Sequence, residues 1–233
     1  MRAELARVVH IGGVRTLPLI TVALAAALLT AGCVPVDTSG GTAPPPAVDP
    51  SLSRQDLDAL TVGRAQPMRG YRRDRFPHWA DQGGGCNTRE VVLKRDGADV
   101  QVDRNCHVVS GRWNSLYDGR TATDPDTLDI DHMVPLAAAW RSGASTWDDE
   151  KRSRFANDLG RPQLMAVSAS VNRAKGDQDP SQWKPPNHGY WCTYAQNWIT
   201  VKRFWQLSVT QTEKTALIDM LGTCQWPSST PQT

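Results

Sequence analysis

The chain has 233 residues, enough for one or two domains, and a formal net charge of only +2 at pH 7. This weak charge excludes a protein that is drawn to nucleic acids or membranes by net charge alone. Any affinity for nucleic acid would have to come from local basic runs, at residues 69–75, 151–154 and 172–175. Such runs are more often solvated surface than phosphate-binding tracks, and both interpretations stay open.

The first 33 residues have the pattern of a secretory signal. Arg2, Arg7 and Arg15 precede an apolar run that ends in "LLTAGC". The run is short for a transmembrane helix, so we predict a signal sequence and a protein that acts outside the cytoplasm. "LLTAGC" resembles a bacterial lipobox, although Thr30 stands where leucine is most frequent. We therefore expect a lipid on Cys33, with ordinary secretion as the alternative.

After Cys33 the composition changes. Residues 34–51 are rich in Pro, Gly, Ser and Thr, which predicts a tether without an apolar core. Residues 52–226 have the size of one domain, and residues 227–233 form a short tail. Loss of residues 1–33 would remove three of the 26 basic and one of the 24 acidic residues, which leaves the two signs equal. Contact with a membrane is expected only through a lipid on Cys33.

Four cysteines follow Cys33, and an even number in a secreted chain predicts disulfides. Four cysteines allow three pairings. We favour Cys86 with Cys106 and Cys192 with Cys224, because each pair encloses a compact stretch of sequence. A zinc site is disfavoured, because the chain lacks the closely spaced cysteine pairs that such sites use.

Two β-hairpins are predicted before the middle of the chain. In residues 88–106, Asp96-Gly97 separates Val91, Val92 and Leu93 from Val100 and Val102, which is typical of a tight turn between strands. In residues 108–123, Asp118-Gly119 separates a strand with Trp113 and Tyr117 from the segment that leads into "LDIDH".

The second half is predicted to be mostly helical. A helix begins near Pro135 and ends by Gly143, and residues 145–159 predict another, with Thr146 and Asp149 at capping-box spacing. Residues 163–168 predict a short buried strand, followed by a helix that Gly176 ends.

The C-terminal part is predicted to form two more helices. Residues 190–207 carry an amphipathic stripe typical of a buried helix face, at positions Trp191, Tyr194, Trp198, Val201 and Trp205. Residues 210–224 begin with Thr210 and Glu213 at capping-box spacing. A disulfide between Cys192 and Cys224 would join these two helices.

"DTLDIDHMVPL" places Asp129, Asp131 and His132 together. Taken alone, this cluster indicates a polar turn before a helix. Together with "QLMAVSASVNRAKGD" it resembles the ββα-metal motif of the HNH endonucleases, in the variant with asparagine as the last member, and most closely a secreted bacterial HNH family. The resemblance implies an α+β fold. It would have a ββα-metal core within residues 111–179, an N-terminal β-hairpin region and C-terminal helical packing.

The resemblance also assigns site residues. His132 would be the general base, because a neutral imidazole with a pKa of roughly 6.5 can accept a proton from water. Asp131 and Asn172 would hold one Mg²⁺ or Mn²⁺ ion through oxygen atoms. Lys175, one turn after Asn172, would meet a phosphate. Gln163 completes the catalytic set. It stands where the HNH signature has its central asparagine, which in that family braces the loop through hydrogen bonds to the backbone.

Some details depart from the family pattern. Gln163 has a longer stem than the usual asparagine, so Asn157 could brace the loop instead or cap a helix. The interval between His132 and Asn172 is long, which is consistent with an inserted helix. Asp177 and Asp179, like Asp129, are expected to be structural or supporting.

The predicted function is a metal-dependent endonuclease that acts outside the cytoplasm, on DNA more than on RNA, with little sequence preference. The alternative is a catalytically silent HNH-like module that binds at the cell surface. A serine or cysteine hydrolase is disfavoured, because the sequence has neither a G-x-S-x-G elbow nor an unpaired cysteine with a partner histidine.

Overall fold

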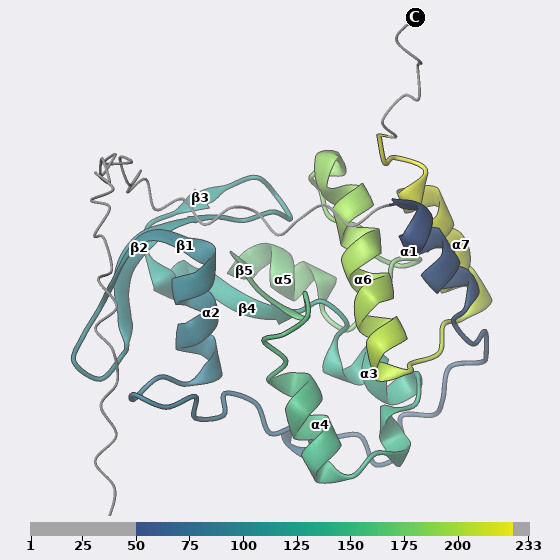
Figure 1. The fold of residues 1–233 in the computed structure, drawn as a ribbon, viewed down its shortest axis with the longest axis horizontal. Coiled ribbons are helices and arrows are strands. Elements are labelled where there is room, and N and C mark those ends of the chain that lie inside the picture. Colours follow the sequence, from purple (N-terminus) through teal and green to yellow (C-terminus); the bar gives the residue numbers. More distant parts are fainter. Residues whose placement is uncertain (1–49, 226–233) are drawn as a thin grey trace, which may run out of the picture. The chain divides into compact units, whose positions relative to one another are not determined.

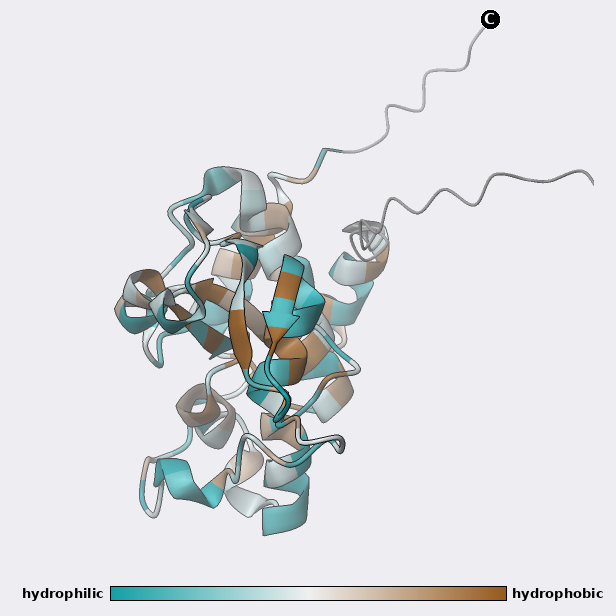
Figure 2. Ribbon diagram, turned by 90° about the vertical axis from the view of Figure 1, so that its left-hand side faces the viewer, coloured by the Kyte–Doolittle hydropathy of each residue, from teal (hydrophilic) through white to brown (hydrophobic). Residues whose placement is uncertain are grey.

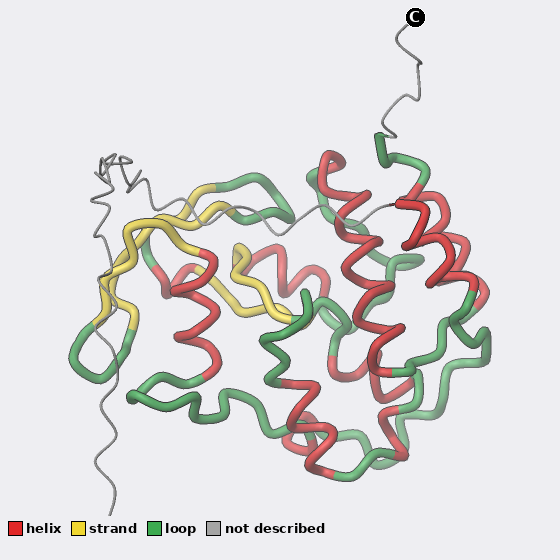
Figure 3. The backbone as a smooth tube through the Cα atoms, viewed as in Figure 1, coloured by secondary structure: helices red, strands yellow, loops and turns green. Residues whose placement is uncertain are grey.

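A computed structural model describes residues 50–225, and the predicted signal sequence, Cys33 and the C-terminal tail lie outside this range. The fold is α+β, with two small antiparallel sheets and seven α-helices in the described part (Figure 1). No helix within it is long and apolar enough to cross a membrane. The strands lie together, while α1 (Pro50–Asp58), α6 (Trp191–Trp205) and α7 (Gln211–Leu221) form a separate helical layer (Figure 3).

The first sheet contains three strands in the order β1-β2-β3. These are β1 (Gly97–Val102), β2 (Val108–Asn114) and β3 (Thr121–Ala122). The turn between β2 and β3 contains Gly119, whose φ of +71° is a left-handed conformation that suits glycine. Because β2 and β3 pair in antiparallel fashion, the hairpin predicted around Asp118-Gly119 is confirmed, although Tyr117, predicted in its first strand, lies in the turn.

The hairpin predicted around Asp96-Gly97 is wrong, because residues Thr88–Asp96 form helix α2. The side chain of Asn87 accepts a hydrogen bond from the Glu90 backbone amide and so caps the helix. Glu90 is buried and accepts a hydrogen bond of 2.7 Å from the Val108 amide. These contacts outweigh the strand preference of the adjacent valines, and the actual hairpin joins β1 to β2.

The second sheet pairs β4 (Leu128–His132) with β5 (Leu164–Ser168), and α5 (Ala169–Lys175) follows directly. Two antiparallel strands and a helix thus occupy the region where the motif was found. Between the strands lie α3 (Leu136–Arg141) and α4 (Asp149–Ala156), the latter within the predicted insertion. The side chain of Asp148 caps α4, so the capping box predicted at Thr146 is wrong; the Thr146 hydroxyl donates instead to the Gly143 carbonyl.

Hydrophobic residues form two cores. Hydrophobic and hydrophilic residues alternate along helices and strands, as expected for elements with one buried face (Figure 2). The larger core contains the predicted stripe of α6, with Tyr194, Trp198, Val201 and Trp205 buried and Trp191 packed at its margin. The smaller core lies between α2 and the strands.

The C-terminal predictions agree with the structure in detail. Thr210 and Glu213 form the predicted capping box of α7. Disulfides join Cys86 to Cys106 and Cys192 to Cys224, the pairing favoured from the sequence. The second disulfide connects the beginning of α6 to the residues that follow α7.

Candidate functional site

The candidate site is built around the end of strand β4. Asp131 pairs with Met165 and His132 with Leu164 in the register between β4 and β5. Side chains alternate along a strand, so Asp131 and His132 leave it on opposite faces. Asp131 meets α5, whereas His132 is directed toward α4 and the segment that precedes α2.

His132 is held by a backbone group. Its Nε2 lies 2.9 Å from the carbonyl oxygen of Ala156, the last residue of α4. A carbonyl oxygen can only accept, so Nε2 carries the proton and Nδ1 of the neutral ring is the free acceptor. Within residues 50–225 no hydrogen bond to Nδ1 is found. The rings of His78 and Trp79 pack beside the imidazole, with centroids 6.4 and 6.0 Å away.

The electrostatic setting keeps His132 neutral. Its side chain is buried, with 5 % of the residue exposed. Burial lowers the pKa of His132 to about 3, the Ala156 carbonyl opposes this shift, and the positive charge of Arg73 adds to it. The ring is therefore an unprotonated base throughout the physiological pH range.

Gln163 braces the loop after β4, as the resemblance implied for the central amide. Its side chain is fully buried, accepts a hydrogen bond from the Val134 amide at 3.1 Å and donates one to the Val134 carbonyl at 3.0 Å. The Gln163 carbonyl also accepts from the Met133 amide. These bonds fix the backbone that follows His132, so Gln163 is a positioning residue here.

Asn157 fixes a different segment. Its side chain accepts from the Ala80 amide at 2.9 Å and donates to the Pro77 carbonyl at 2.8 Å. Asn157 therefore holds in place the segment that carries His78 and Trp79 beside His132. The bracing of the loop itself falls to Gln163.

Lys175 is not available to a phosphate in this structure, contrary to the expectation from its spacing. Its side chain is 0 % exposed, and its ammonium donates to Asp131 Oδ2 at 2.5 Å. It also donates to the carbonyl oxygens of His132 and Met133, at 2.8 and 3.0 Å. Lys175 thus ties the last turn of α5 to the end of β4.

Asp131 is enclosed together with Lys175. The hydroxyl of Tyr117 donates to the same Oδ2 atom at 2.5 Å. Burial raises the pKa of Asp131 and lowers the pKa of Lys175, while their mutual attraction opposes both shifts. Burial, with the Asp131 charge next, raises the pKa of Tyr117 well above its usual value, so this hydroxyl stays a donor.

Asn172 meets a different carboxylate from the one expected. Its Nδ2 donates to Asp129 Oδ2 at 3.1 Å, and Arg173 lies 3.9 Å from the same atom. The side chain of Asp129 is 33 % exposed, in contrast to that of Asp131. Tyr117 is a site residue that the motif did not assign. Asp129, expected to be structural or supporting, shares a strand face with Asp131 and contacts Asn172.

These donors fit a hard divalent cation by type. The carboxylates of Asp129 and Asp131 leave the same face of β4, and Asn172 faces them from α5. Its Oδ1 has no hydrogen bond to any residue of the range 50–225. Lys175 and Tyr117 both donate to one of the two Asp131 carboxylate oxygens, Oδ2. No group of three or more His, Cys, Asp or Glu side chains able to hold a metal occurs in the described part of the chain, so solvent or substrate would have to complete the coordination.

Comparison with known proteins places the site in a family. Residues 88–220, more than half of the chain, match the family described as "GmrSD restriction endonucleases, C-terminal domain". The chain belongs to this family. The match runs from the first residue of α2 into α7, so the GmrSD C-terminal domain includes every residue from Asp129 to Lys175 discussed above.

A close relative is also found. A protein of Arthroderma benhamiae (strain ATCC MYA-4681 / CBS 112371), described as an uncharacterized secreted protein, is 52% identical over 201 residues, which cover 86% of this chain and 96% of that protein. No solved structure matches the chain. Membership of the GmrSD C-terminal domain family indicates a nuclease-related protein. The HNH subtype remains a prediction. The bacterial origin also remains a prediction, because the relative is fungal.

Proposed function

We propose that this protein is a metal-dependent endonuclease that hydrolyses phosphodiester bonds of nucleic acid, preferably DNA, outside the cytoplasm. Membership of an endonuclease family supports the reaction class. Two disulfides and a relative described as secreted support the location. A lipid on Cys33 would add a membrane anchor.

The observation that carries the proposal is the hydrogen bond between His132 Nε2 and the Ala156 carbonyl. It leaves Nδ1 as the basic atom, and burial keeps the ring neutral. In the proposed reaction Nδ1 takes a proton from water as the water oxygen attacks phosphorus; the P–O bond to the leaving oxygen breaks, and that oxygen takes a proton from solvent. The Ala156 carbonyl stabilises the imidazolium that forms, because it remains hydrogen-bonded to the other nitrogen.

The other residues orient this base or bind the cation. Gln163 and Lys175 fix the backbone at and directly after His132 by hydrogen bonds to residues 132–134. A Mg²⁺ or Mn²⁺ ion would be held by Asn172 with Asp131 or the adjacent Asp129. When bound, it would neutralise charge on the phosphoryl oxygens and stabilise the leaving oxygen.

One observation favours a second candidate. The Lys175 ammonium already neutralises Asp131, as expected in a protein that has lost metal binding and kept the scaffold. In that case the molecule would be a catalytically silent HNH-like module for binding at the cell surface.

The test is cleavage of supercoiled plasmid by the mature chain, with Mg²⁺, with Mn²⁺ or with chelator. We expect metal-dependent nicking that falls at least 100-fold in His132→Ala, the range for loss of a general base. Asp131→Asn and Asp129→Asn are compared across metal concentrations, and the true ligand is the one whose loss raises the Mg²⁺ requirement. A folded parent that cuts neither DNA nor RNA would support the silent module.

A further inference from the structure

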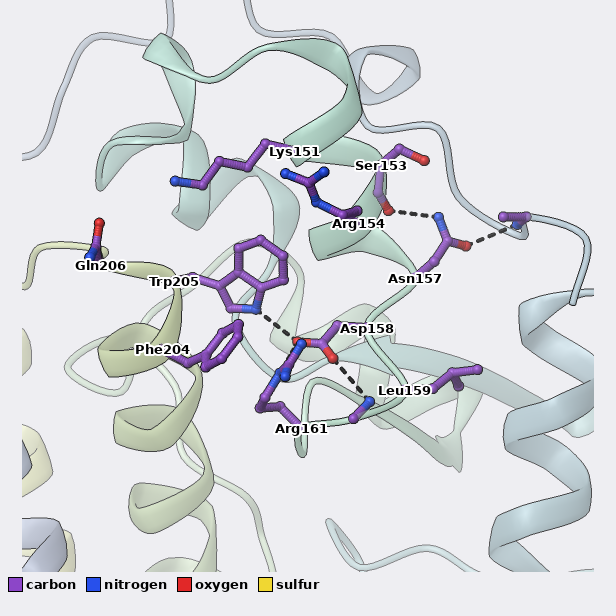
Figure 4. Close-up of a pocket in the computed structure, with 12 residues that line it drawn as sticks. Lys151, Ser153, Arg154, Asn157, Asp158, Leu159, Arg161, Phe204, Trp205 and Gln206 are labelled. Carbon is purple, nitrogen blue, oxygen red and sulfur yellow. Dashed lines mark hydrogen bonds and ion pairs between the residues drawn. The ribbon is translucent and has the colours of Figure 1, made fainter.

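A surface cavity lies next to the candidate site and has no role in the chemistry above. Its volume is about 730 Å³, within the range of pockets that hold small molecules. The cavity is lined by α4, by the loop after it and by the end of α6 (Figure 4). We call it the Arg161–Phe204 cavity, after two of the side chains that line it.

The cavity adjoins His132 through shared chain segments. Asn157 and Ala80 line it. Their chain neighbours, Ala156 and Trp79, are among the residues that contact the imidazole. A polymer that passes His132 would therefore meet this cavity within a short distance.

Arg161 is held ready for an anion. The buried carboxylate of Asp158 accepts from Arg161 Nε at 2.7 Å, and the same oxygen accepts from the Trp205 indole at 2.8 Å. Asp158 thus fixes the guanidinium through one nitrogen. Both terminal nitrogens of Arg161 lack a hydrogen bond within residues 50–225, and this planar pair suits the oxygens of a phosphate.

A second cation faces the cavity from α4. The Lys151 ammonium lies 4.5 Å from the Trp147 ring centroid and has no carboxylate partner in the described structure. The third cation of the lining, Arg154, is already paired with Glu150. The cavity therefore presents Lys151, which has no carboxylate partner within the described residues, and Arg161, which Asp158 pairs with only through Nε.

An exposed aromatic ring accompanies these cations. Phe204 is 53 % exposed, although its neighbour Trp205 is buried. The Arg161 guanidinium lies 3.6 Å from the Phe204 ring centroid, so cation and ring form one stacked unit. Aromatic rings beside basic groups are the means by which proteins bind unpaired nucleotides, with the base on the ring and the phosphate on the cation.

We propose that the Arg161–Phe204 cavity binds an unpaired nucleotide of the nucleic acid, with its base stacked on Phe204 and its phosphate on Arg161 and Lys151. This inference rests on the proposed function and narrows its substrate to a single strand, or to a locally unpaired stretch near the bond that is cut. A paired base is already stacked in its helix and cannot use the ring.

The test measures binding and requires no cleavage. A fluorescent 12-nucleotide single strand, its RNA counterpart and a 12-base-pair duplex are titrated with the mature chain in chelator, and anisotropy gives each Kd. We expect Phe204→Leu to weaken single-strand binding about 10-fold or more, and the duplex much less. Phe204→Trp keeps a stacking surface and should bind as tightly as the parent.

A matched pair of lysines tests the phosphate contact. Lys151→Gln should reduce the slope of log Kd against log salt for the single strand by about 0.7, the value for one phosphate contact. Lys184 also lies over a tryptophan ring, at 4.9 Å from Trp191, but does not line the cavity. Lys184→Gln should leave the slope unchanged.

Equal Kd values for Phe204→Leu and the parent, or equal losses for single strand and duplex, would overturn the inference. Plasmid cleavage by the parent distinguishes this failure from failure of the proposed function. If the parent cleaves plasmid but Phe204→Leu binds the single strand as tightly as the parent, the cavity assignment is wrong and the nuclease function stands. If single-strand binding depends on Phe204 but the parent cuts no nucleic acid, the cavity assignment stands and the proposed nuclease function is wrong.

Discussion

The imidazole of His132 is buried, and its hydrogen-bond partner is a backbone carbonyl. No carboxylate is hydrogen-bonded to its ring in the described structure, and the Ala156 carbonyl is its polar partner. A proton added to the ring would create a buried charge without a counterion, which is why burial lowers the pKa to about 3. In the unfolded chain the pKa returns to roughly 6.5.

The difference in pKa predicts a pH dependence of stability. The unfolded state binds a proton at His132 below pH 6.5 and the native state only near pH 3, so stability should fall as pH decreases through this interval. The slope from one such group is about 1.4 kcal/mol per pH unit. Urea unfolding of the parent and of His132→Gln, from pH 7 to pH 4, measures it.

The informative quantity is the difference in free energy of unfolding between the parent and His132→Gln at each pH, because the other ionisable groups titrate in both proteins. The free energies of unfolding should converge as pH decreases, since the variant lacks the titrating group. His188→Gln, at an exposed position, serves as the control and should run parallel to the parent. Parallel curves for His132→Gln as well would contradict the assigned burial effect.

Sequence spacing predicted part of this site. Helical spacing put Lys175 one turn after Asn172, and the two side chains do reach neighbouring carboxylates of β4, those of Asp131 and Asp129. The Ala156 carbonyl could not be predicted, because it comes from a helix 24 residues away along the chain. The burial of Lys175 also depends on packing that spacing does not encode.

At the scale of elements, Lys175 is the main polar link between α5 and β4. Its ammonium balances Asp131 and satisfies two carbonyl oxygens at the end of the strand. Removing one partner of a buried pair leaves an uncompensated charge, which costs more than the pair itself contributes.

We therefore expect Lys175→Met to lower the free energy of unfolding by about 3–5 kcal/mol. Arg173→Gln, on the same helix and with its side chain 77 % exposed, should change it by less than about 0.5 kcal/mol. Guanidinium denaturation measures both. Combining Lys175→Met with Asp131→Asn should recover part of the loss, and strictly additive losses would argue against a coupled pair.

Helix α2 shows why local pattern misleads. Two adjacent valines followed by Asp-Gly are typical of a hairpin, yet Val92 and Leu93 pack into the smaller core from one side of a helix. The decisive groups are the Asn87 cap and the hydrogen bond from the Val108 amide to Glu90. The second of these joins residues 18 apart. Where local and distant signals agreed, as in α7 with its capping box, the prediction was confirmed.

At the scale of the whole molecule, the two disulfides secure different regions. Cys86–Cys106 joins the start of α2 to the β1–β2 turn, across 20 residues, and Cys192–Cys224 links α6 to the end of α7, across 32 residues. Each bond stabilises mainly by restricting the unfolded chain, so the longer interval should contribute slightly more.

The double substitution Cys192→Ser with Cys224→Ser should lower the free energy of unfolding by about 2–4 kcal/mol. Cys86→Ser with Cys106→Ser should cost a similar or slightly smaller amount. Thermal unfolding of each double variant, with the parent in oxidising and reducing buffer, measures these losses. A reduced parent as stable as the oxidised one would show that neither bond contributes.

The hydrogen bond from His132 to the main chain of Ala156 also bears on how the protein can evolve. Every amino acid has a carbonyl oxygen, so whichever residue occupies position 156 would offer the imidazole the same acceptor. The side chain there is 0 % exposed, and space alone limits what fits. During evolution, residue 156 can therefore change to any side chain that fits the space. The proton stays on Nε2 of His132 as long as the backbone at residue 156 keeps its position.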